Sequence, residues 1–242
     1  MDIQGAIVDE TKFKEFNESE LIDPVKHTLV DQQIIQLIQR IQTAKSPVIY
    51  VGNGIRLANR VNEFITLAEK LRIPVVTAIS GSDIIWHDHP LCYGKPGICG
   101  DRIGNIMVQN ADLLIILGTR LSIRQVSYAY DLLAPKAYKV MVDIDLAEME
   151  KPTLSIDMPI HANLKEFIDK FSTAVKGKDF PDFADWRIWG RDIEKQLPTL
   201  FDDNPSIDGY TSSYVFADAL FKQLKDGDVV VTGNGTAYTS TY

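Results

Sequence analysis

Short apolar segments that alternate with amphipathic segments constrain the fold of this chain more than any other feature of its sequence. The apolar segments that predict strands are residues 48–51, 74–77, 112–117, 138–143 and 158–161. The segments with helical spacing of apolar residues are 31–43, 57–71, 101–109 and 164–175. The run at 112–117 is apolar almost throughout, which is typical of a parallel strand covered on both faces. We therefore predict an α/β fold of three layers, a parallel sheet with helices on both faces.

Composition and charge limit the size and the partners of the protein. The 242 residues, 45% of them hydrophobic, predict one large domain, or one domain and a piece of another. A formal charge of -8 without any Lys/Arg cluster argues against nucleic acid as a partner. No signal-like N-terminus and no apolar run of membrane length occur, so we expect a soluble, cytoplasmic protein with no membrane partner. Cys92 and Cys99 lack metal-site spacing and are predicted to be free thiols.

The pattern changes along the chain in a way that predicts four regions. Residues 1–29 have no sustained period and are expected to be a linker, and residues 30–176 form the predicted central domain. Residues 177–209, rich in proline and carrying Trp186 and Trp189 on a polar helix, are expected to be a second linker. Residues 210–242 predict a helix over 214–224 and a strand over 229–231. Because one helix and one strand cannot bury each other, this tail is expected to be the start of a domain that continues further.

A glycine-rich stretch around the third predicted strand indicates a nucleotide cradle. Gly118-Thr119-Arg120 and then Arg124 follow that strand, and the loop before it carries glycines at positions 94, 97, 100 and 104. Glycine lets a backbone approach a ligand closely, and two arginines offer planar cations to phosphate or carboxylate oxygens. Ligands of parallel sheets bind at the carboxyl ends of the strands, where these motifs fall. The alternative is that the glycines are turn residues and the arginines form surface ion pairs.

The order of the motifs resembles that of a known family. The segments are VIYVGNG, PVVTAISGSDIIWHDHPLCYGKPGICG, NADLLIILGTRLSIRQ and VMVDIDLAEMEKPTLSIDMPIHANLKEF. In this order they resemble the central domain of thiamine-diphosphate-dependent enzymes of the acetolactate synthase type. The opening MDIQG is similar to the end of that family's pyrimidine-binding domain, and GDVVVTGNGTAYTSTY to the start of its pyrophosphate-binding domain.

The resemblance implies a site for FAD or ADP, with a role that is largely structural. The positions that match the family's cofactor-binding residues are Gly52, Gly54, Thr77, Gly81, Gly97, Gly100, Gly118, Thr119, Arg120, Arg124, Asp143 and Ile144. Asp143 and Ile144 match the pair that lies against the adenosine. The chain departs from the family at Cys99, where His is common, at Ser122, where an acid is common, and at Asn163, where Asp is common. An empty site, or one for a smaller nucleotide, therefore remains an alternative.

The catalytic parts of such an enzyme are absent from this sequence. The family's cofactor glutamate and its magnesium-binding G-D-G segment do not occur here, so no catalytic or metal residue is assigned and the segment alone is predicted to be inactive. Thiamine diphosphate, Mg²⁺ and a 2-oxo acid substrate are expected only in a full-length parent. That parent is expected to be a homodimer or homotetramer, and the segment a monomer or weak dimer.

Two other functions remain open. One is a stand-alone nucleotide- or NAD-binding module, although no G-x-G-x-x-G occurs. The other is a structural spacer with a vacant site. His87 and His89, which flank Asp88, are expected to be structural or to lie at a rim. A metal at the Asp143/Asp145 pair is the less favoured interpretation of that pair.

Overall fold

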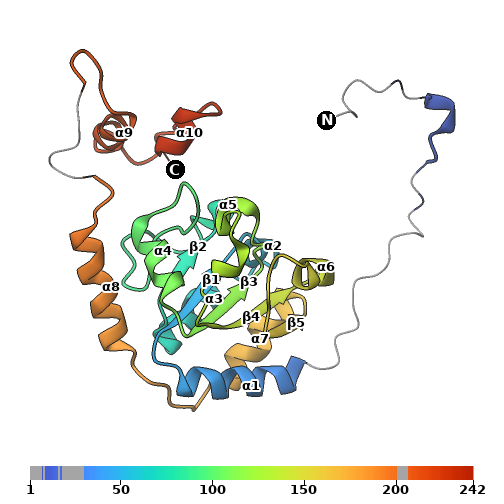
Figure 1. Cartoon of the computed structure of the whole chain (residues 1–242). Helices are drawn as coiled ribbons and strands as arrows, with labels where there is room; N and C mark the ends of the chain where they lie inside the picture. The colour runs from blue at the N-terminus through green and yellow to red at the C-terminus, as the bar shows by residue number, and fades with distance from the viewer. Residues whose placement is uncertain (1–6, 8, 16, 18–29, 201–206, 242) are drawn as a thin grey trace.

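A five-stranded parallel sheet forms the centre of the structure. The computed structural model describes residues 7, 9–15, 17, 30–200 and 207–241. The strands are β1 (Pro47–Val51), β2 (Val75–Thr77), β3 (Leu113–Leu117), β4 (Tyr138–Asp143) and β5 (Met158–His161). They lie in the order β2-β1-β3-β4-β5, and every neighbouring pair is parallel (Figure 1). The predicted α/β class with a parallel sheet is confirmed.

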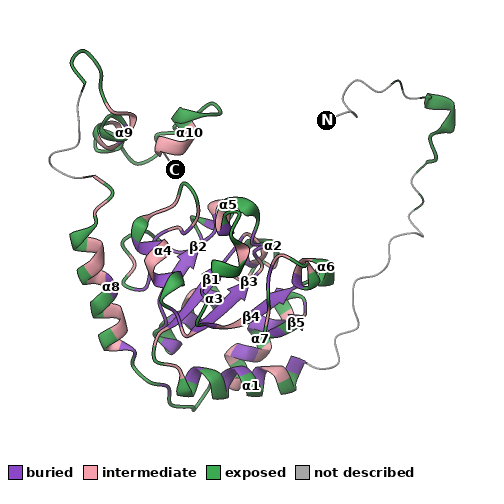
Figure 2. Ribbon diagram, viewed as in Figure 1, coloured by how far each residue is buried: buried purple, intermediate pink, exposed green. Residues whose placement is uncertain are grey.

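The position of β3 in the middle of the sheet explains why its residues are all apolar. The strand pairs with β1 on one side and β4 on the other, so that Ile115 lies between Ile49 and Val140. Alternate β3 residues point into two different cores, Leu113, Ile115 and Leu117 into one and Leu114 and Ile116 into the other. All five are buried, and Figure 2 shows the strands buried throughout the middle of the molecule. A polar residue at any of these positions would lie in one of the two cores without water.

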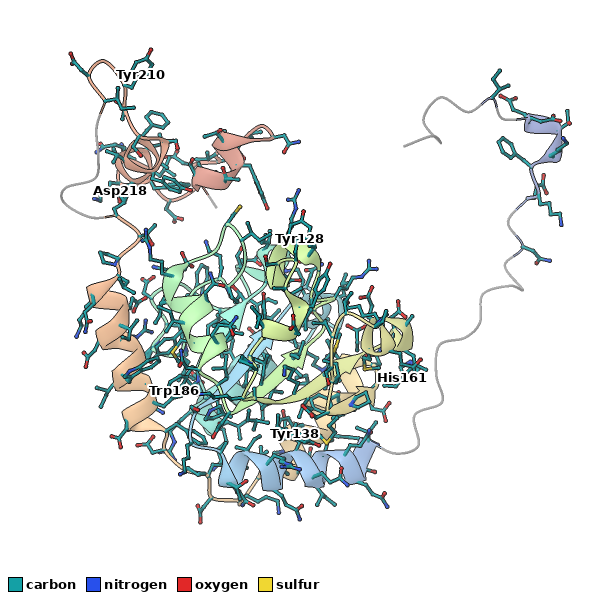
Figure 3. All side chains as sticks on the ribbon, in the orientation of Figure 1. Tyr128, Tyr138, His161, Trp186, Tyr210 and Asp218 are labelled. Atoms are coloured by element: carbon teal, nitrogen blue, oxygen red, sulfur yellow. The ribbon has the colours of Figure 1, made fainter. Side chains whose placement is uncertain are left out.

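Three helices cover the first face of the sheet. They are α1 (Val30–Thr43), α3 (Val61–Leu71) and α7 (Leu164–Ala174). Each buries residues at helical spacing, and the Phe167 and Phe171 rings of α7 lie 5.5 Å apart within this core. At the edge of the layer, the guanidinium of Arg40 on α1 lies 3.9 Å from the ring centroid of Tyr138, which is labelled beside α1 in Figure 3.

The second face is covered by α4 (Arg102–Gln109), the short α6 (Leu146–Glu150) and α8 (Ala184–Gln196). Helix α8 falls in the stretch that the sequence indicated as a linker, and it packs against α4. Trp186 points from α8 toward the sheet (Figure 3), where its Nε1 donates a hydrogen bond of 3.0 Å to the Pro47 carbonyl. Its ring stacks on Trp189 at 4.8 Å. The two tryptophans therefore serve packing, as their spacing predicted.

Two predicted elements were wrong. The helix expected over 57–71 is divided into α2 (Gly54–Leu57) and α3, because Asn59 adopts a left-handed backbone with φ of 53° between them. The strand expected over 229–231 does not form, and Val229 and Val231 are 84% and 90% exposed. No strand of the described chain pairs with this segment, so its apolar residues have neither a hydrogen-bonding partner nor a core to join.

The remaining described segments are short. Helix α9 (Ser213–Phe221), predicted over 214–224, contacts α10 (Thr236–Thr241), and Ser240 Oγ donates a 2.7 Å hydrogen bond to Ser213 Oγ. The 3-10 turns are η1 (Glu10–Lys12), η3 (Ile79–Gly81) and η4 (Tyr130–Leu132). The predicted linker 1–29, including MDIQG, lies mostly outside the described residues. None of the described helices combines the length and the apolar character that crossing a membrane requires.

Candidate functional site

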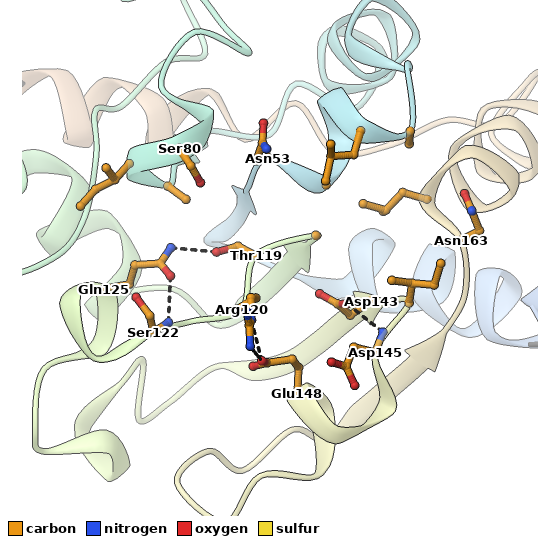
Figure 4. Close-up of a pocket in the computed structure, with 18 of the residues that line it drawn as sticks. Asn53, Ser80, Thr119, Arg120, Ser122, Gln125, Asp143, Asp145, Glu148 and Asn163 are labelled. Atoms are coloured by element: carbon orange, nitrogen blue, oxygen red, sulfur yellow. Dashed lines mark hydrogen bonds and ion pairs between the residues drawn. The ribbon is translucent and has the colours of Figure 1, made fainter. Parts of the chain in front are cut away.

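A cavity of about 800 Å³ opens at the carboxyl ends of the strands. Its lining comes from segments that follow or end all five strands: Ala78, Ile79 and Ser80 after β2, Asn53, Gly54, Leu57 and Ala58 after β1, Gly118, Thr119 and Arg120 after β3, Asp143, Ile144 and Asp145 at β4, and Asn163 and Leu164 after β5. Figure 4 shows this arrangement. The chain passes from β1 to β2 on one side and later places β3 on the other side of β1, so the strand order reverses between β1 and β3. Doubly wound sheets bind their ligands at that reversal.

Glycines form the floor of the cavity where β1 and β3 end. The Gly52 N–H donates to the Leu117 carbonyl at 2.9 Å, and the Gly54 N–H donates to the Gly118 carbonyl at 3.0 Å. A Cβ on Gly54 would lie 2.7 Å from Gly118 Cα, and one on Gly52 would lie 2.4 Å from the Gly118 oxygen. Gly118 has a φ of +57°, which only glycine adopts without strain. Gly54 and Gly118 line the cavity, whereas Gly52 packs beneath them.

Gln125 organises the wall beyond β3, although the sequence did not single it out. Its Nε2 donates to Thr119 Oγ1 at 2.8 Å and to the Tyr50 hydroxyl at 3.2 Å, and its Oε1 accepts from the Ser122 N–H at 2.9 Å. With Ser122 it forms the capping box of α5 (Ile123–Val126), a pattern of serine followed three residues later by glutamine that is visible in the sequence. Burial raises the pKa of the Tyr50 phenol far above its ordinary value. The hydrogen bond from Gln125 thus holds the Thr119 side chain at the cavity wall.

The two arginines of the predicted anion site differ in their surroundings. Arg120 Nε donates to Glu148 Oε1 at 2.6 Å, and the second oxygen of Glu148 lies 2.9 Å from Lys151 Nζ. Burial alone would raise the pKa of the Glu148 carboxyl, but the hydrogen bonds from Lys151 and Arg120 hold it below its ordinary value. Arg124 also lines the cavity and is exposed, and within the described residues its guanidinium has no hydrogen bond or ion pair. Arg124 is thus the cation that is available to a ligand.

Two carboxylates lie at the end of β4. Asp143 is only 7% exposed, and its Oδ1 accepts a 3.0 Å hydrogen bond from the Asp145 N–H. Burial raises the pKa of Asp143 above its ordinary value. Asp145 caps α6 by accepting from the Ala147 N–H at 3.0 Å. Figure 4 shows both acids on the opposite side of Arg120 from Gln125, so the lining is acidic toward β4 and neutral or cationic toward α5.

The structure brings most of the predicted site residues together but separates some of them. Those that line the cavity are Gly54, Gly118, Thr119, Arg120, Arg124, Asp143 and Ile144. Thr77 is buried at the end of β2, and Gly81 packs against the turn after β1, where a Cβ would lie 3.2 Å from the Gly52 carbonyl carbon.

Gly97 and Gly100 do not line the large cavity. Gly97 borders a separate cavity of about 260 Å³ beside Tyr50, and a Cβ on it would lie 2.7 Å from the Arg124 oxygen. A Cβ on Gly100 would lie 2.0 Å from the Lys95 oxygen, within a tight turn. These glycines therefore let loops pack against each other.

Some lining residues were not predicted as ligand-binding. The polar ones among them are Asn53, Ser80, Ser122, Gln125, Asp145, Glu148 and Asn163. Asn163 caps α7, because its Oδ1 accepts a 2.9 Å hydrogen bond from the Lys165 N–H. An asparagine just before a helical period is a recognisable cap signal, but a cap signal does not say that the residue faces a cavity.

No group of three or more His, Cys, Asp or Glu side chains in the described part of the chain is placed to hold a metal ion. His89 lies 3.3 Å from Glu69 Oε1 and accepts from the Leu91 N–H through Nδ1 at 3.1 Å, which fits the predicted structural role. Cys92 is buried and Cys99 exposed, and both are free thiols.

Comparison with known proteins gives a consistent result. Residues 34–171 match the family described as "Thiamine pyrophosphate enzyme, central domain". A probable acetolactate synthase large subunit from Methanocaldococcus jannaschii is 32% identical over 175 residues, 72% of this chain and 29% of the relative. The acetolactate synthase large subunit of Corynebacterium glutamicum is 31% identical over 176 residues, 72% of this chain and 28% of the relative. A probable acetolactate synthase large subunit from Methanococcus aeolicus is 35% identical over 185 residues, 72% of this chain and 31% of the relative. The chain thus spans less than a third of the length of these relatives.

Proposed function

Because the chain belongs to the family of thiamine pyrophosphate enzyme central domains and is related to acetolactate synthase, we propose that its large cavity binds an adenine nucleotide, FAD or ADP, as a structural ligand. The observation that carries the proposal is the cavity at the β1/β3 reversal, which has a glycine floor and carries a cation on one side and acids on the other. Its volume of about 800 Å³ is within the range of about 300–1,000 Å³ that small-molecule and cofactor sites occupy.

The distribution of charge supports one orientation of the ligand. A diphosphate would lie over Gly54 and Gly118, within reach of Arg124, because these glycines leave no side chain above the floor. The ribose and base would lie toward β4, where Asp143 and Asp145 offer acceptors for hydroxyl groups. The reverse orientation would put phosphates against two carboxylates, which repel them.

The parent protein has a separate proposed function. We infer that the full-length protein is a thiamine-diphosphate- and Mg²⁺-dependent enzyme that decarboxylates or joins 2-oxo acids, since the matched relatives are named acetolactate synthases. The present chain would contribute a structural domain and no catalytic group. Incubating it with pyruvate, thiamine diphosphate and Mg²⁺ should release no carbon dioxide above background, and release well above background would contradict this part of the proposal.

Ligand titration tests the nucleotide site directly. Purified protein should show a saturable rise in melting temperature with FAD or ADP, because a ligand of the folded state stabilises it, and visible flavin absorbance would identify FAD. Arg124→Ala should weaken binding about tenfold to hundredfold, the loss of one charge-assisted hydrogen bond. Lys176→Ala is the matched control, since Lys176 follows the end of α7 that is remote from the cavity. Binding of NAD alone would favour the stand-alone module, and binding of none would favour a vacant spacer.

A further inference from the structure

Arg120, Glu148 and Lys151 form a cluster of two cations around one carboxylate at the rim of the large cavity. Arg120 Nε and Nη2 lie 2.6 and 2.5 Å from the same oxygen, Glu148 Oε1. Lys151 Nζ lies 2.9 Å from Glu148 Oε2. The Glu148 side chain is only 13% exposed, whereas that of Arg120 is 78% exposed. The Glu148 carboxylate thus pairs with two cations at once, Arg120 through Oε1 and Lys151 through Oε2.

The pairing directs the Arg120 side chain away from the ligand side of the cavity. Figure 4 shows Arg120 pointing toward Glu148, on the side opposite Asn53 and Ser80. The guanidinium edge formed by Nε and Nη2, one of the two that can hold a carboxylate or phosphate with two N–H groups, is occupied by Glu148. The cavity lining then presents Arg124 as its only cation without a partner in the described chain, against Asp143 and Asp145.

Lys151 makes the release of Arg120 feasible. Its Nζ also donates to the carbonyl oxygens of Arg120 and Leu121, so its position does not depend on the Arg120 side chain. If the guanidinium moves to a bound anion, Glu148 keeps Lys151 as a partner and is not left as an unpaired, largely buried charge. An unpaired buried carboxylate is strongly destabilising, and a second cation removes that barrier.

We propose that Glu148 is the resting partner of Arg120, and that a bound di- or polyphosphate takes Arg120 from it. Glu148 thereby lowers the affinity of the site and selects ligands with enough negative charge to compete with a carboxylate. This regulation rests on the proposed nucleotide site. The competing role is orientation, in which Glu148 holds Arg120 ready to bind the ligand through its remaining N–H groups; the two roles predict opposite effects of removing the carboxylate.

Titration of ADP and of inorganic pyrophosphate against matched variants distinguishes the roles. Glu148→Gln and Glu148→Ala should bind both anions about threefold to fivefold more tightly than wild type, the upper part of the range for an ion pair with an exposed partner. Glu150→Gln, which removes the same charge from the exposed part of α6, should stay within about twofold of wild type. The gain from Glu148→Gln should vanish in the Arg120→Ala background, because the carboxylate then has no guanidinium to withhold.

A direct readout separates this inference from the nucleotide proposal. Pyrophosphate should shift the ¹⁵N signal of Arg120 Nε in wild type, assigned by its loss in Arg120→Lys. If ADP fails to bind but pyrophosphate shifts this signal, the proposal of a nucleotide site is wrong, while the proposed exchange of Arg120 from Glu148 to a bound phosphate stands. If ADP binds but both Glu148 variants bind it equally or more weakly, or the gain persists without Arg120, the exchange is overturned. Absence of the shift with pyrophosphate overturns it as well.

Discussion

Replacement of Gly118 by alanine tests the crowded junction between β1 and β3. The residue has a φ of +57°, and a left-handed backbone costs a residue with a Cβ roughly 1–2 kcal/mol. The new methyl group would also lie 2.7 Å from Gly54 Cα and 2.4 Å from Leu164 Cδ1, and overpacking of this kind costs about 1–3 kcal/mol. The free energy of unfolding should therefore fall by about 2–5 kcal/mol in Gly118→Ala.

Gly177→Ala provides the matched control for this experiment. Gly177 has a similar φ of +70°, but a Cβ there would meet no atom within 4 Å. Its alanine variant should lose only the backbone contribution of roughly 1–2 kcal/mol, so the difference between the two variants measures the steric clash alone. Urea unfolding followed by circular dichroism gives both values, provided that the slopes of the transitions agree.

The reasoning would be refuted by equal losses in the two variants. Equal losses would mean that the backbones of the β1 and β3 turns are free to separate, and the glycine floor would then not be a rigid part of the site. A larger loss in Gly118→Ala should be accompanied by weaker nucleotide binding, because Gly54 and Leu164 both line the cavity.

Two further predictions concern polar groups of the cavity rim. Burial raises the pKa of Asp143, so the folded protein binds its proton more tightly than the unfolded chain, and wild type should lose stability relative to Asp143→Asn as the pH rises from about 4 to about 7. Urea unfolding of both proteins across that range measures the difference, and a difference independent of pH would contradict it. Asn163→Ala should cost about 1 kcal/mol through loss of the α7 cap, whereas Asn163→Asp should cost little, as thermal and urea unfolding would show; equal losses would mean that the side-chain oxygen is not the stabilising group.

The fold was predictable because each strand of the sheet corresponds to a short apolar run that can be recognised from the local sequence alone. An apolar run such as Leu113–Leu117 can only be buried on two faces, and the adjacent helical periods supply the two covering layers. The order of the strands was not predictable in this way, since it depends on contacts between distant segments. The same limit explains the error at 229–231, where the local pattern is that of a strand but no partner strand lies beside it in the described chain.

The site was predictable where a glycine follows a strand and less so where a glycine lies in a loop. Gly118 comes directly after β3 and Gly54 three residues after the end of β1, so the topology of a parallel sheet brings them to one edge. Gly97 and Gly100 are also glycines in a glycine-rich stretch, but at these positions the absence of a side chain lets neighbouring loop backbone pack closely and does not make room for a ligand. Glu148 was missed although it lies within the quoted segment VMVDIDLAEMEKPTLSIDMPIHANLKEF, because only the folded structure shows that it pairs with Arg120.

The hydrogen bonds of the glycine floor decide which groups can hold an anion there. The N–H groups of Gly52 and Gly54 are already used by the carbonyls of Leu117 and Gly118, and the Gly118 N–H donates to Val142 at 3.0 Å. The floor therefore differs from a phosphate loop, in which backbone N–H groups point at the ligand. Its glycines give a ligand room but offer it none of these three N–H groups, so we expect the main attraction to come from Arg124, and from Arg120 when Glu148 releases it. Affinity in this site should accordingly depend on guanidinium groups far more than on the backbone that shapes it.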